Sequence, residues 1–410
     1  MKNTKRHRWR TLLVVAAALL AGPMVQADVV TDWNVTAGDI AVAAKLPPPA
    51  YRVMAMVQSA VYEAVNAITK RYPPDRVKLD VAPGASVDAA IAAANRATLL
   101  KLVPSQQAAI DSAYQTALSA IADGPAKTAG IEVGNKAAAA ILALRADDGA
   151  AAPETYRPRT TPGVYVPTVI PAVPQWPQRK PWVMASADQF RPGPPPNLTS
   201  DLWARDYNEI KAIGAKNSTR RTTEQTDIAR FWEATMPPVY FPVVRSVANT
   251  PGRESTQNAR LLAVAAQTID DAVIAVMDAK YHYNFWRPIT AIRNGDTDGN
   301  DATERDASWV PFIDTPMHPE YPCAHCIVSA AVGAVLQAEI GMGPTPKLST
   351  TSPTAPGVVR SWTQISDFVQ EVANARIYDG VHYRNSTEVG TAMGQKIGEL
   401  AATKYLRPLK

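Results

Sequence analysis

Apolar residues recur at three- and four-residue intervals along most of the chain, a spacing typical of amphipathic α-helices. In residues 51–68, one helical face collects Val53, Val57, Ala60, Val61, Ala64, Val65 and Ile68. Similar patterns predict helices over residues 86–102, 105–122, 128–146, 201–213, 222–235, 257–279, 324–340, 361–378 and 388–404. The sequence shows no convincing alternation of the kind expected for strands. Its many small side chains allow close helix packing, so it predicts an all-α, multi-helix bundle.

Proline interrupts this helical pattern between residues 153 and 196. Proline at such density excludes helix and favours extended or polyproline segments. Four aromatic residues are interleaved with the prolines: Tyr156, Tyr165, Trp176 and Trp182. We therefore expect an irregular, proline-rich strap (residues 151–200) that packs over the bundle, between an N-terminal helical part (28–150) and a C-terminal helical part (201–410). A flexible linker between two domains is the alternative.

The first 27 residues have the pattern of a secretory signal peptide. Five Lys and Arg residues precede an apolar run over 12–21, and the small residues after it predict cleavage near Ala27–Asp28. The run is short for a membrane span, although a retained anchor is the alternative. We therefore expect a periplasmic or secreted protein. No second apolar stretch is long enough to cross a bilayer, so no membrane span is expected after processing.

Removal of this leader changes the charge of the chain. The complete sequence has 42 Lys and Arg against 37 Asp and Glu, and five of the cations lie in the leader. The processed chain therefore carries 37 side chains of each sign. This balance gives no reason to expect nucleic acid or an anionic membrane surface as a partner. Positive charge that matters for function must be local.

The last third of the chain combines cations with histidines in three segments. In the first, Lys280 and Arg287 are seven residues apart. This spacing predicts that both point from one helical face towards an anion, with a solvated basic face as the alternative. In the second, Cys323 and Ala324 begin a predicted helix, whose first backbone N–H groups attract anions. His325 in its first turn is positioned to transfer a proton, unless it is a hydrogen-bonded core residue.

The third segment contains Arg376 and His382. Six residues separate them, so the two cannot share one face of a straight helix. Gly380 lies between them and can end the helix in a left-handed conformation. We expect the chain to turn there, which would bring both side chains to the same site.

In order and spacing, these segments resemble the superfamily of vanadium-dependent haloperoxidases and type 2 phosphatidic acid phosphatases. The resemblance rests on Lys-x6-Arg-Pro from Lys280, on Pro-Cys-Ala-His ending at His325, and on Arg-x5-His ending at His382. Further segments look like its soluble, exported bacterial haloperoxidase-like branch: residues 52–68, 189–192, 221–226, 231–232 and 286–291. The resemblance covers nearly the whole processed chain and implies an all-α fold of the double four-helix-bundle type.

The resemblance also implies roles for individual residues. Lys280, Arg287 and Arg376 would neutralise the oxygens of vanadate, or of phosphate in the same pocket, and Cys323 and Ala324 would add hydrogen bonds. His325 would be the acid–base residue. His382 would be the ligand of vanadium in a haloperoxidase or the nucleophile that forms a phosphohistidine in a phosphatase. In the peroxidase role, Lys280 would also be catalytic.

Three functions follow from this resemblance. The first is halide oxidation by hydrogen peroxide in a vanadate-dependent haloperoxidase-like enzyme. The second is hydrolysis of phosphomonoesters by an acid phosphatase. The third is a non-catalytic oxyanion-binding or redox-sensitive member. The expected partners are therefore small molecules, and the sequence is also compatible with a homo-oligomer. The halide is not evident from the sequence, although Trp286 is a candidate for the wall opposite His382.

Three positions depart from the family's pattern. Cys323 replaces the usual serine and is a poorer hydrogen-bond donor. Ala324 replaces glycine, although it keeps its N–H group. Ser386 stands where a carboxylate often follows the apical histidine, so His382 has lost the expected group for orienting its ring. Glu388 or Asp379 could substitute for that carboxylate.

Other motifs in the chain suggest different chemistry. Cys323 and Cys326 are the only cysteines and form a C-x-x-C motif, as in thiol–disulfide oxidoreductases. The βαβ pattern of those enzymes is missing, so a structural disulfide or a redox switch is the more plausible role. Residues 296–301 resemble a calcium loop with a misplaced glycine and no Glu at its twelfth position. A divalent-metal site that combines histidines with Asp314 and Glu320 lacks the usual ligand spacing, and the nearby cations would repel the ion.

Overall fold

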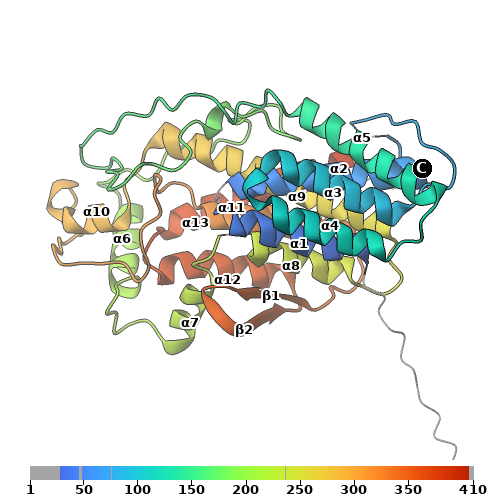
Figure 1. The fold of residues 1–410 in the computed structure, drawn as a ribbon. Helices are drawn as coiled ribbons and strands as arrows, with labels where there is room; N and C mark the ends of the chain where they lie inside the picture. Colours follow the sequence, from blue (N-terminus) through green and yellow to red (C-terminus); the bar gives the residue numbers. More distant parts are fainter. Residues whose placement is uncertain (1–27, 46–48, 75, 236, 406–410) are drawn as a thin grey trace, which may run out of the picture.

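The computed structural model describes residues 28–45, 49–74, 76–235 and 237–405. The predicted signal peptide lies outside them. Within these residues the chain forms thirteen α-helices and one small antiparallel hairpin, as the helical periodicity predicts (Figure 1). No helix of the described residues is long and apolar enough to cross a membrane.

Five helices form the N-terminal part of the bundle: α1 (Val29–Ala43), α2 (Pro49–Thr69), α3 (Val87–Leu102), α4 (Gln107–Ser119) and α5 (Pro125–Leu144). The smaller α6 (Asp201–Ile213), α7 (Thr223–Phe231) and α10 (Pro288–Arg293) lie towards the other end of the molecule (Figure 1). The C-terminal part consists of α8 (Pro237–Ala248), α9 (Ser255–Tyr283), α11 (Ala324–Ile340), α12 (Ile365–Tyr378) and α13 (Arg384–Tyr405).

Helix α9 joins the two parts, because it packs against α2 on one side and against α11 and α13 on the other. It is buried around its circumference from Leu261 to Lys280, as expected for a central helix. A capping box between Glu254 and Gln257 begins it, and Asn284 ends it in the left-handed conformation at φ 50°. The C-terminal end of this central helix carries Lys280.

The proline-rich strap is irregular and packs against α9 (Figure 1). Trp176 and Trp182 are both buried. The buried guanidinium of Arg179 pairs with both carboxylate oxygens of Asp270, each at 2.7 Å. Asp271 accepts three backbone N–H groups of the strap, from residues 182, 183 and 184. These contacts exclude a free linker in this part of the chain.

The hairpin formed by β1 (Leu348–Ser352) and β2 (Ala355–Trp362) was not expected from the sequence. Alternate residues of β1 are buried, but apart from Leu348 its inward side chains are Thr350 and Ser352. Apolar alternation therefore does not mark this strand. Helix α8 was also missed, because its sequence begins with two prolines and has a third, Pro242, inside the helix. Proline is tolerated in the first turn of a helix, where the missing N–H costs little.

Glycine allows α11 and α13 to pack closely. A Cβ atom on Gly394 of α13 would lie 2.1 Å from the carbonyl oxygen of Ile327 in α11. We expect Gly394→Ala to lower the free energy of unfolding by about 1–3 kcal/mol through overpacking, measured by urea denaturation. The matched control is Gly38→Ala in α1, where a Cβ would meet nothing within 4 Å. This control should be neutral or stabilising by about 0.5–1 kcal/mol, and equal destabilisation of both variants would contradict the packing argument.

Candidate oxyanion site

The C-terminal end of α9 places a lysine in the interior of the protein. Lys280 is fully buried, and its ammonium donates to the carbonyl oxygens of Pro319 at 2.9 Å and Glu320 at 2.7 Å. Burial, and then the neighbouring Arg287, hold the pKa of Lys280 well below its usual value. An anion bound beside this lysine would favour its charged form.

Arg287 lies in the same site, but it does not continue the helix that carries Lys280, as its spacing had suggested. Helix α9 ends at Tyr283, and Asn284 turns the chain, so Lys280 and Arg287 do not share a helical face. Arg287 instead caps the start of α10. The prediction of a common face was wrong because Asn284 adopts positive φ, which the periodicity does not reveal.

The Arg287 guanidinium connects the other segments of the site. It donates to the carbonyl oxygens of His318 at 2.9 Å and Val381 at 2.8 Å. Its Nη2 lies 3.0 Å from Nδ1 of His318, and its Nη1 lies 3.3 Å from Nε2 of His382. Burial lowers the pKa of Arg287 to about 10, so it stays protonated at neutral pH.

The start of α11 was expected to supply backbone donors, but the N–H of Cys323 donates to the carbonyl oxygen of Ser386 at 3.1 Å. Cys323 is the N-cap residue, and its sulfur accepts the N–H of Cys326 at 3.3 Å, as a serine hydroxyl would at this position. Burial raises the pKa of Cys323, but the hydrogen bond with Cys326 and the charge of Arg376 together leave it below the usual value. Both cysteines are buried free thiols in this structure. Ala324 is the first residue of α11, a position that does not require glycine.

His325 occupies the first turn of this helix. It is 4% exposed, and its Nε2 lies 3.3 Å from the carbonyl oxygen of Ala234. A carbonyl oxygen only accepts, so Nε2 carries the proton and Nδ1 is left to take one. Burial, and then Arg376, hold the pKa of His325 well below 6.5, which keeps the ring neutral before an anion binds.

Arg376 and His382 converge because the chain turns at Gly380, as predicted. Gly380 has φ 83°, and the N–H of His382 donates to the carbonyl oxygen of Arg376 at 3.1 Å. The guanidinium of Arg376 donates to the carbonyl oxygen of Trp232 and lies 2.8 Å from the carboxylate of Asp379. Its buried Nε has no hydrogen-bond partner among the described residues. A donor with no partner in a buried cationic site is available to an anionic ligand.

His382 is held by a carboxylate that the sequence did not indicate. Its Nδ1 lies 2.8 Å from Oε1 of Glu320, whereas the Ser386 hydroxyl is 3.5 Å away. Arg287 can only donate to Nε2, so the ring proton is on Nδ1 and the lone pair of Nε2 faces the guanidinium. Of the two expected substitutes, Glu388 is exposed and Asp379 pairs with Arg376.

Two further residues of this site, His318 and Glu320, were therefore missing from the predicted set. Sequence reasoning considered both only as ligands of a divalent metal. The available signal was their position in the segment that leads to His325. Among the described residues, no group of three or more His, Cys, Asp or Glu side chains is arranged to hold a metal ion.

The donor set of this site fits a tetrahedral oxyanion. Three buried cations, Lys280, Arg287 and Arg376, stand against the buried carboxyls of Glu320 and Asp379. Burial raises the pKa values of these two carboxyls to about 7 in each case. The cations also act together on His382, because burial and then Arg287, Lys280 and Arg376 lower its pKa. The excess of positive charge would be compensated by vanadate or phosphate.

The raised pKa of Asp379 predicts a pH dependence of stability. Its carboxyl binds a proton more tightly in the folded chain, where the pKa is about 7, than at its usual value of 3.8. Its contribution to stability is therefore lost as the pH rises from about 4 to about 7. We expect wild type to lose free energy of unfolding relative to Asp379→Asn between about pH 5 and about pH 8. Urea denaturation at both pH values measures this, and a pH-independent difference would contradict it.

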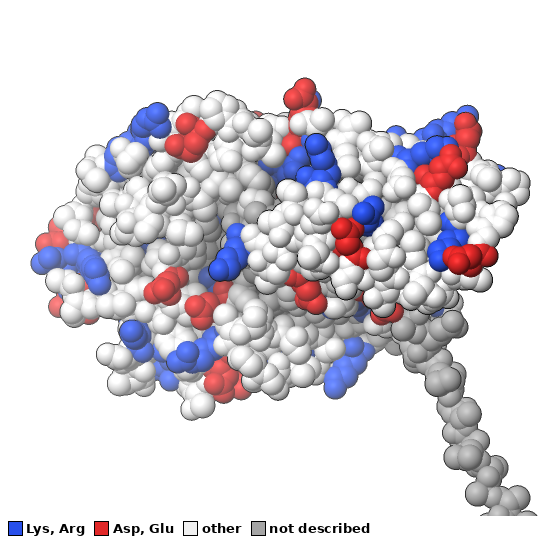
Figure 2. Space-filling view, in the orientation of Figure 1, with Lys and Arg blue, Asp and Glu red and all other residues white. Residues whose placement is uncertain are grey.

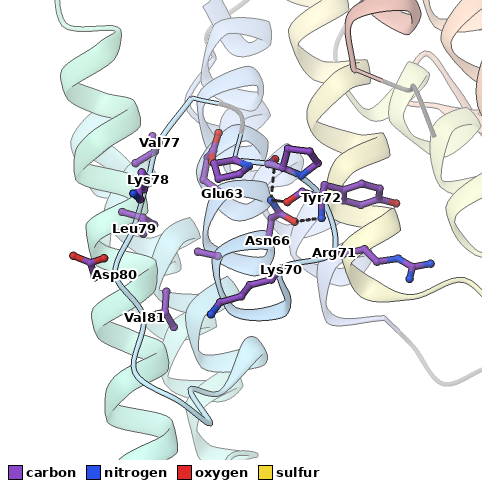
Figure 3. A pocket seen from close by; sticks show the side chains of 13 residues that line it. Glu63, Asn66, Lys70, Arg71, Tyr72, Val77, Lys78, Leu79, Asp80 and Val81 are labelled. Atoms are coloured by element: carbon purple, nitrogen blue, oxygen red, sulfur yellow. Dashed lines mark hydrogen bonds between the residues drawn. The ribbon is translucent and has the colours of Figure 1, made fainter. Parts of the chain in front are cut away.

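Other surface features do not coincide with this site. A surface groove of about 640 Å³ lies between the end of α2 and the loop that follows it, and Lys70, Tyr72 and Lys78 are among its lining residues (Figure 3). None of the predicted oxyanion-binding residues lines this groove. On the face shown in Figure 2, basic and acidic side chains are interspersed.

Comparisons with known proteins agree with this fold. Residues 260–410 match the family model of the VCPO second helical-bundle domain. The vanadium chloroperoxidase of Curvularia inaequalis is 28% identical over 170 residues, which is 34% of this chain and 28% of that protein. The matched region thus spans less than a third of that relative's length.

Solved structures similar to this chain include those of bacterial vanadium-dependent haloperoxidases. The crystal structure of the first bacterial vanadium-dependent iodoperoxidase matches with a TM-score of 0.79 and 23% identity, covering 92% of this chain and 96% of that one. An apo-type bacterial vanadium-dependent chloroperoxidase matches with a TM-score of 0.71 and 16% identity, covering 87% and 92%. These similarities show that the chain has the fold of the vanadium-dependent haloperoxidases.

The region matched by the family model, residues 260–410, contains every residue predicted for the oxyanion site, and its similarity is to the vanadium haloperoxidase superfamily.

Proposed function

We propose that this protein is a vanadate-dependent haloperoxidase that oxidises a halide with hydrogen peroxide. The observation that carries the proposal is the arrangement of Lys280, Arg287 and Arg376 around a histidine, His382, whose Nε2 is kept unprotonated. Similarity to bacterial iodo- and chloroperoxidases supports the peroxidase function over the phosphatase function. The leader sequence supports a periplasmic or secreted location.

In this proposal each residue has a defined task. Arg287 and Arg376 hold oxyanion oxygens through charge-assisted hydrogen bonds, and the N–H group of Ala324 at the start of α11 adds a donor. His382 would hold vanadium through Nε2. When bound, vanadate would supply a Lewis-acid centre for the oxidation of halide by hydrogen peroxide. Lys280 stabilises negative charge on the bound oxygens, and His325 accepts or returns a proton at Nδ1.

The proposal is tested by assaying iodide and bromide oxidation by hydrogen peroxide before and after incubation of the processed protein with orthovanadate. We expect oxidation to depend on vanadate and to be abolished by His382→Ala. The matched control is His282→Ala, which removes an exposed histidine near the end of α9.

Absence of oxidation in the vanadate-treated wild type would overturn the haloperoxidase proposal. A phosphomonoester assay on the same sample would then distinguish the two remaining functions. Hydrolysis inhibited by vanadate would indicate a phosphatase, and oxyanion binding without turnover would indicate a non-catalytic member. Binding without turnover would implicate Cys323, which replaces the family's usual serine among the predicted oxyanion-binding residues.

A further inference from the structure

Glu320 connects two segments of the site that are far apart in the sequence. Its Oε1 lies 2.8 Å from Nδ1 of His382 and accepts the backbone N–H of Tyr383 at 3.1 Å. The backbone carbonyl of the same residue accepts Lys280 at 2.7 Å. Glu320 and His382 are both buried, so their contact is shielded from water.

We propose that Glu320 is the positioning residue of His382, and that its carboxylate replaces the one missing at Ser386. It keeps the ring proton on Nδ1 and holds Nε2 towards the oxyanion. This inference rests on the proposed function, in which Nε2 binds the oxyanion. Partners of this kind orient a ligating histidine and increase its basicity.

The other carboxylates considered for orienting His382 do not contact its ring. Ser386 lies one helical turn along the chain, 3.5 Å from Nδ1, and its hydroxyl carries no charge. Glu388 is exposed, and Asp379 is committed to Arg376. Among the described residues, the carboxylate that contacts the ring of His382 is that of Glu320.

A purely structural role does not explain the second oxygen of Glu320. The Tyr383 N–H needs one acceptor, which an amide would also provide, yet Oε2 is buried without a hydrogen-bond partner among the described residues. Burying a carboxylate oxygen without a hydrogen bond is unfavourable. The other oxygen of the same group, Oε1, lies 2.8 Å from Nδ1 of His382. The carboxyl group is therefore placed where it can act on the ring of His382.

The proposal can be tested directly by moving the carboxylate from residue 320 to the position of Ser386. Glu320→Gln keeps the shape of the side chain and an acceptor for Tyr383 but removes the charge. We expect it to raise the dissociation constant for orthovanadate about 10- to 100-fold, measured by titration of the vanadium-free protein. In the double variant Glu320→Gln/Ser386→Asp, the new carboxylate lies within reach of Nδ1 and should recover most of the affinity. The control Glu388→Gln should bind like wild type.

Two results would overturn the proposal. One is an affinity of Glu320→Gln within about twofold of wild type, since loss of the positioning group should exceed this. The other is a folded double variant with no recovery. Nitrogen NMR of His382 in the wild-type protein without vanadate provides a test that needs no variant. The proposal requires the proton on Nδ1, and a proton on Nε2 would contradict it even if Glu320→Gln failed to fold.

These measurements separate this proposal from the proposed function. If no variant oxidises halide but vanadate affinity follows the expected pattern, Glu320 positions His382 in a protein that is not a haloperoxidase. If halide oxidation is present and Glu320→Gln changes neither affinity nor turnover, the positioning role alone is wrong.

Discussion

His325→Ala will bind orthovanadate with nearly the affinity of wild type but will oxidise halide roughly 10²- to 10⁴-fold more slowly, the range typical of a lost general acid–base group. The expected separation follows from the site's geometry. In the proposed function the oxyanion is held by three cations and His382, whereas His325 lies in the first turn of α11 as a neutral ring whose Nδ1 is left to accept a proton. Steady-state kinetics and vanadate titration on the same preparation measure both quantities.

The control for this variant is again His282→Ala, which should change neither quantity. Equal losses of affinity and turnover in His325→Ala would mean that His325 holds the oxyanion instead of transferring a proton. Unchanged turnover would remove it from the mechanism altogether.

The second large effect concerns the attachment of the strap. We expect Asp270→Ala to lower the free energy of unfolding by about 3–5 kcal/mol, because it leaves the buried Arg179 without its main partner. It also removes the acceptor of the Trp182 indole N–H, at 2.8 Å. Urea denaturation measures the loss, and limited proteolysis between residues 151 and 200 should show whether the strap detaches.

An exposed ion pair provides the comparison. Glu132 and Lys136 lie one turn apart on α5 with both side chains more than half exposed, so Glu132→Ala should leave stability nearly unchanged. A similar effect of both substitutions would show that burial does not determine the contribution of the Arg179–Asp270 pair.

The sequence predicted the helices well where one face is apolar over several turns, as in α2 and α13. It predicted elements poorly where other forces decide the conformation. Helix α8 contains three prolines, and β1 buries small polar side chains, so neither carries the expected pattern. The strap was recognised from its prolines and aromatics, but its attachment through Asp270 and Asp271 depends on contacts with residues about 90 positions away.

In the predicted site too, features set by the local sequence were predicted and features set by distant contacts were not. The turn at Gly380 followed from local chemistry and is present, whereas the path from Lys280 to Arg287 depends on a single left-handed asparagine. The contact between Glu320 and His382 was beyond sequence reasoning because it crosses 62 residues. A single sequence contains no signal for which distant carboxylate replaces a missing near one.

The loop before α11 concentrates much of the site in one short piece of chain. Residues 318–325 supply carbonyl oxygens to Arg287 and Lys280, the carboxylate beside His382, the N-cap of α11 and His325 itself. This segment is therefore a unit that could be exchanged as a whole between relatives that share the surrounding helices. Sequence changes within this segment would alter its proton-carrying side chains and the carbonyl contacts of Lys280 and Arg287 together. The helical scaffold would stay the same.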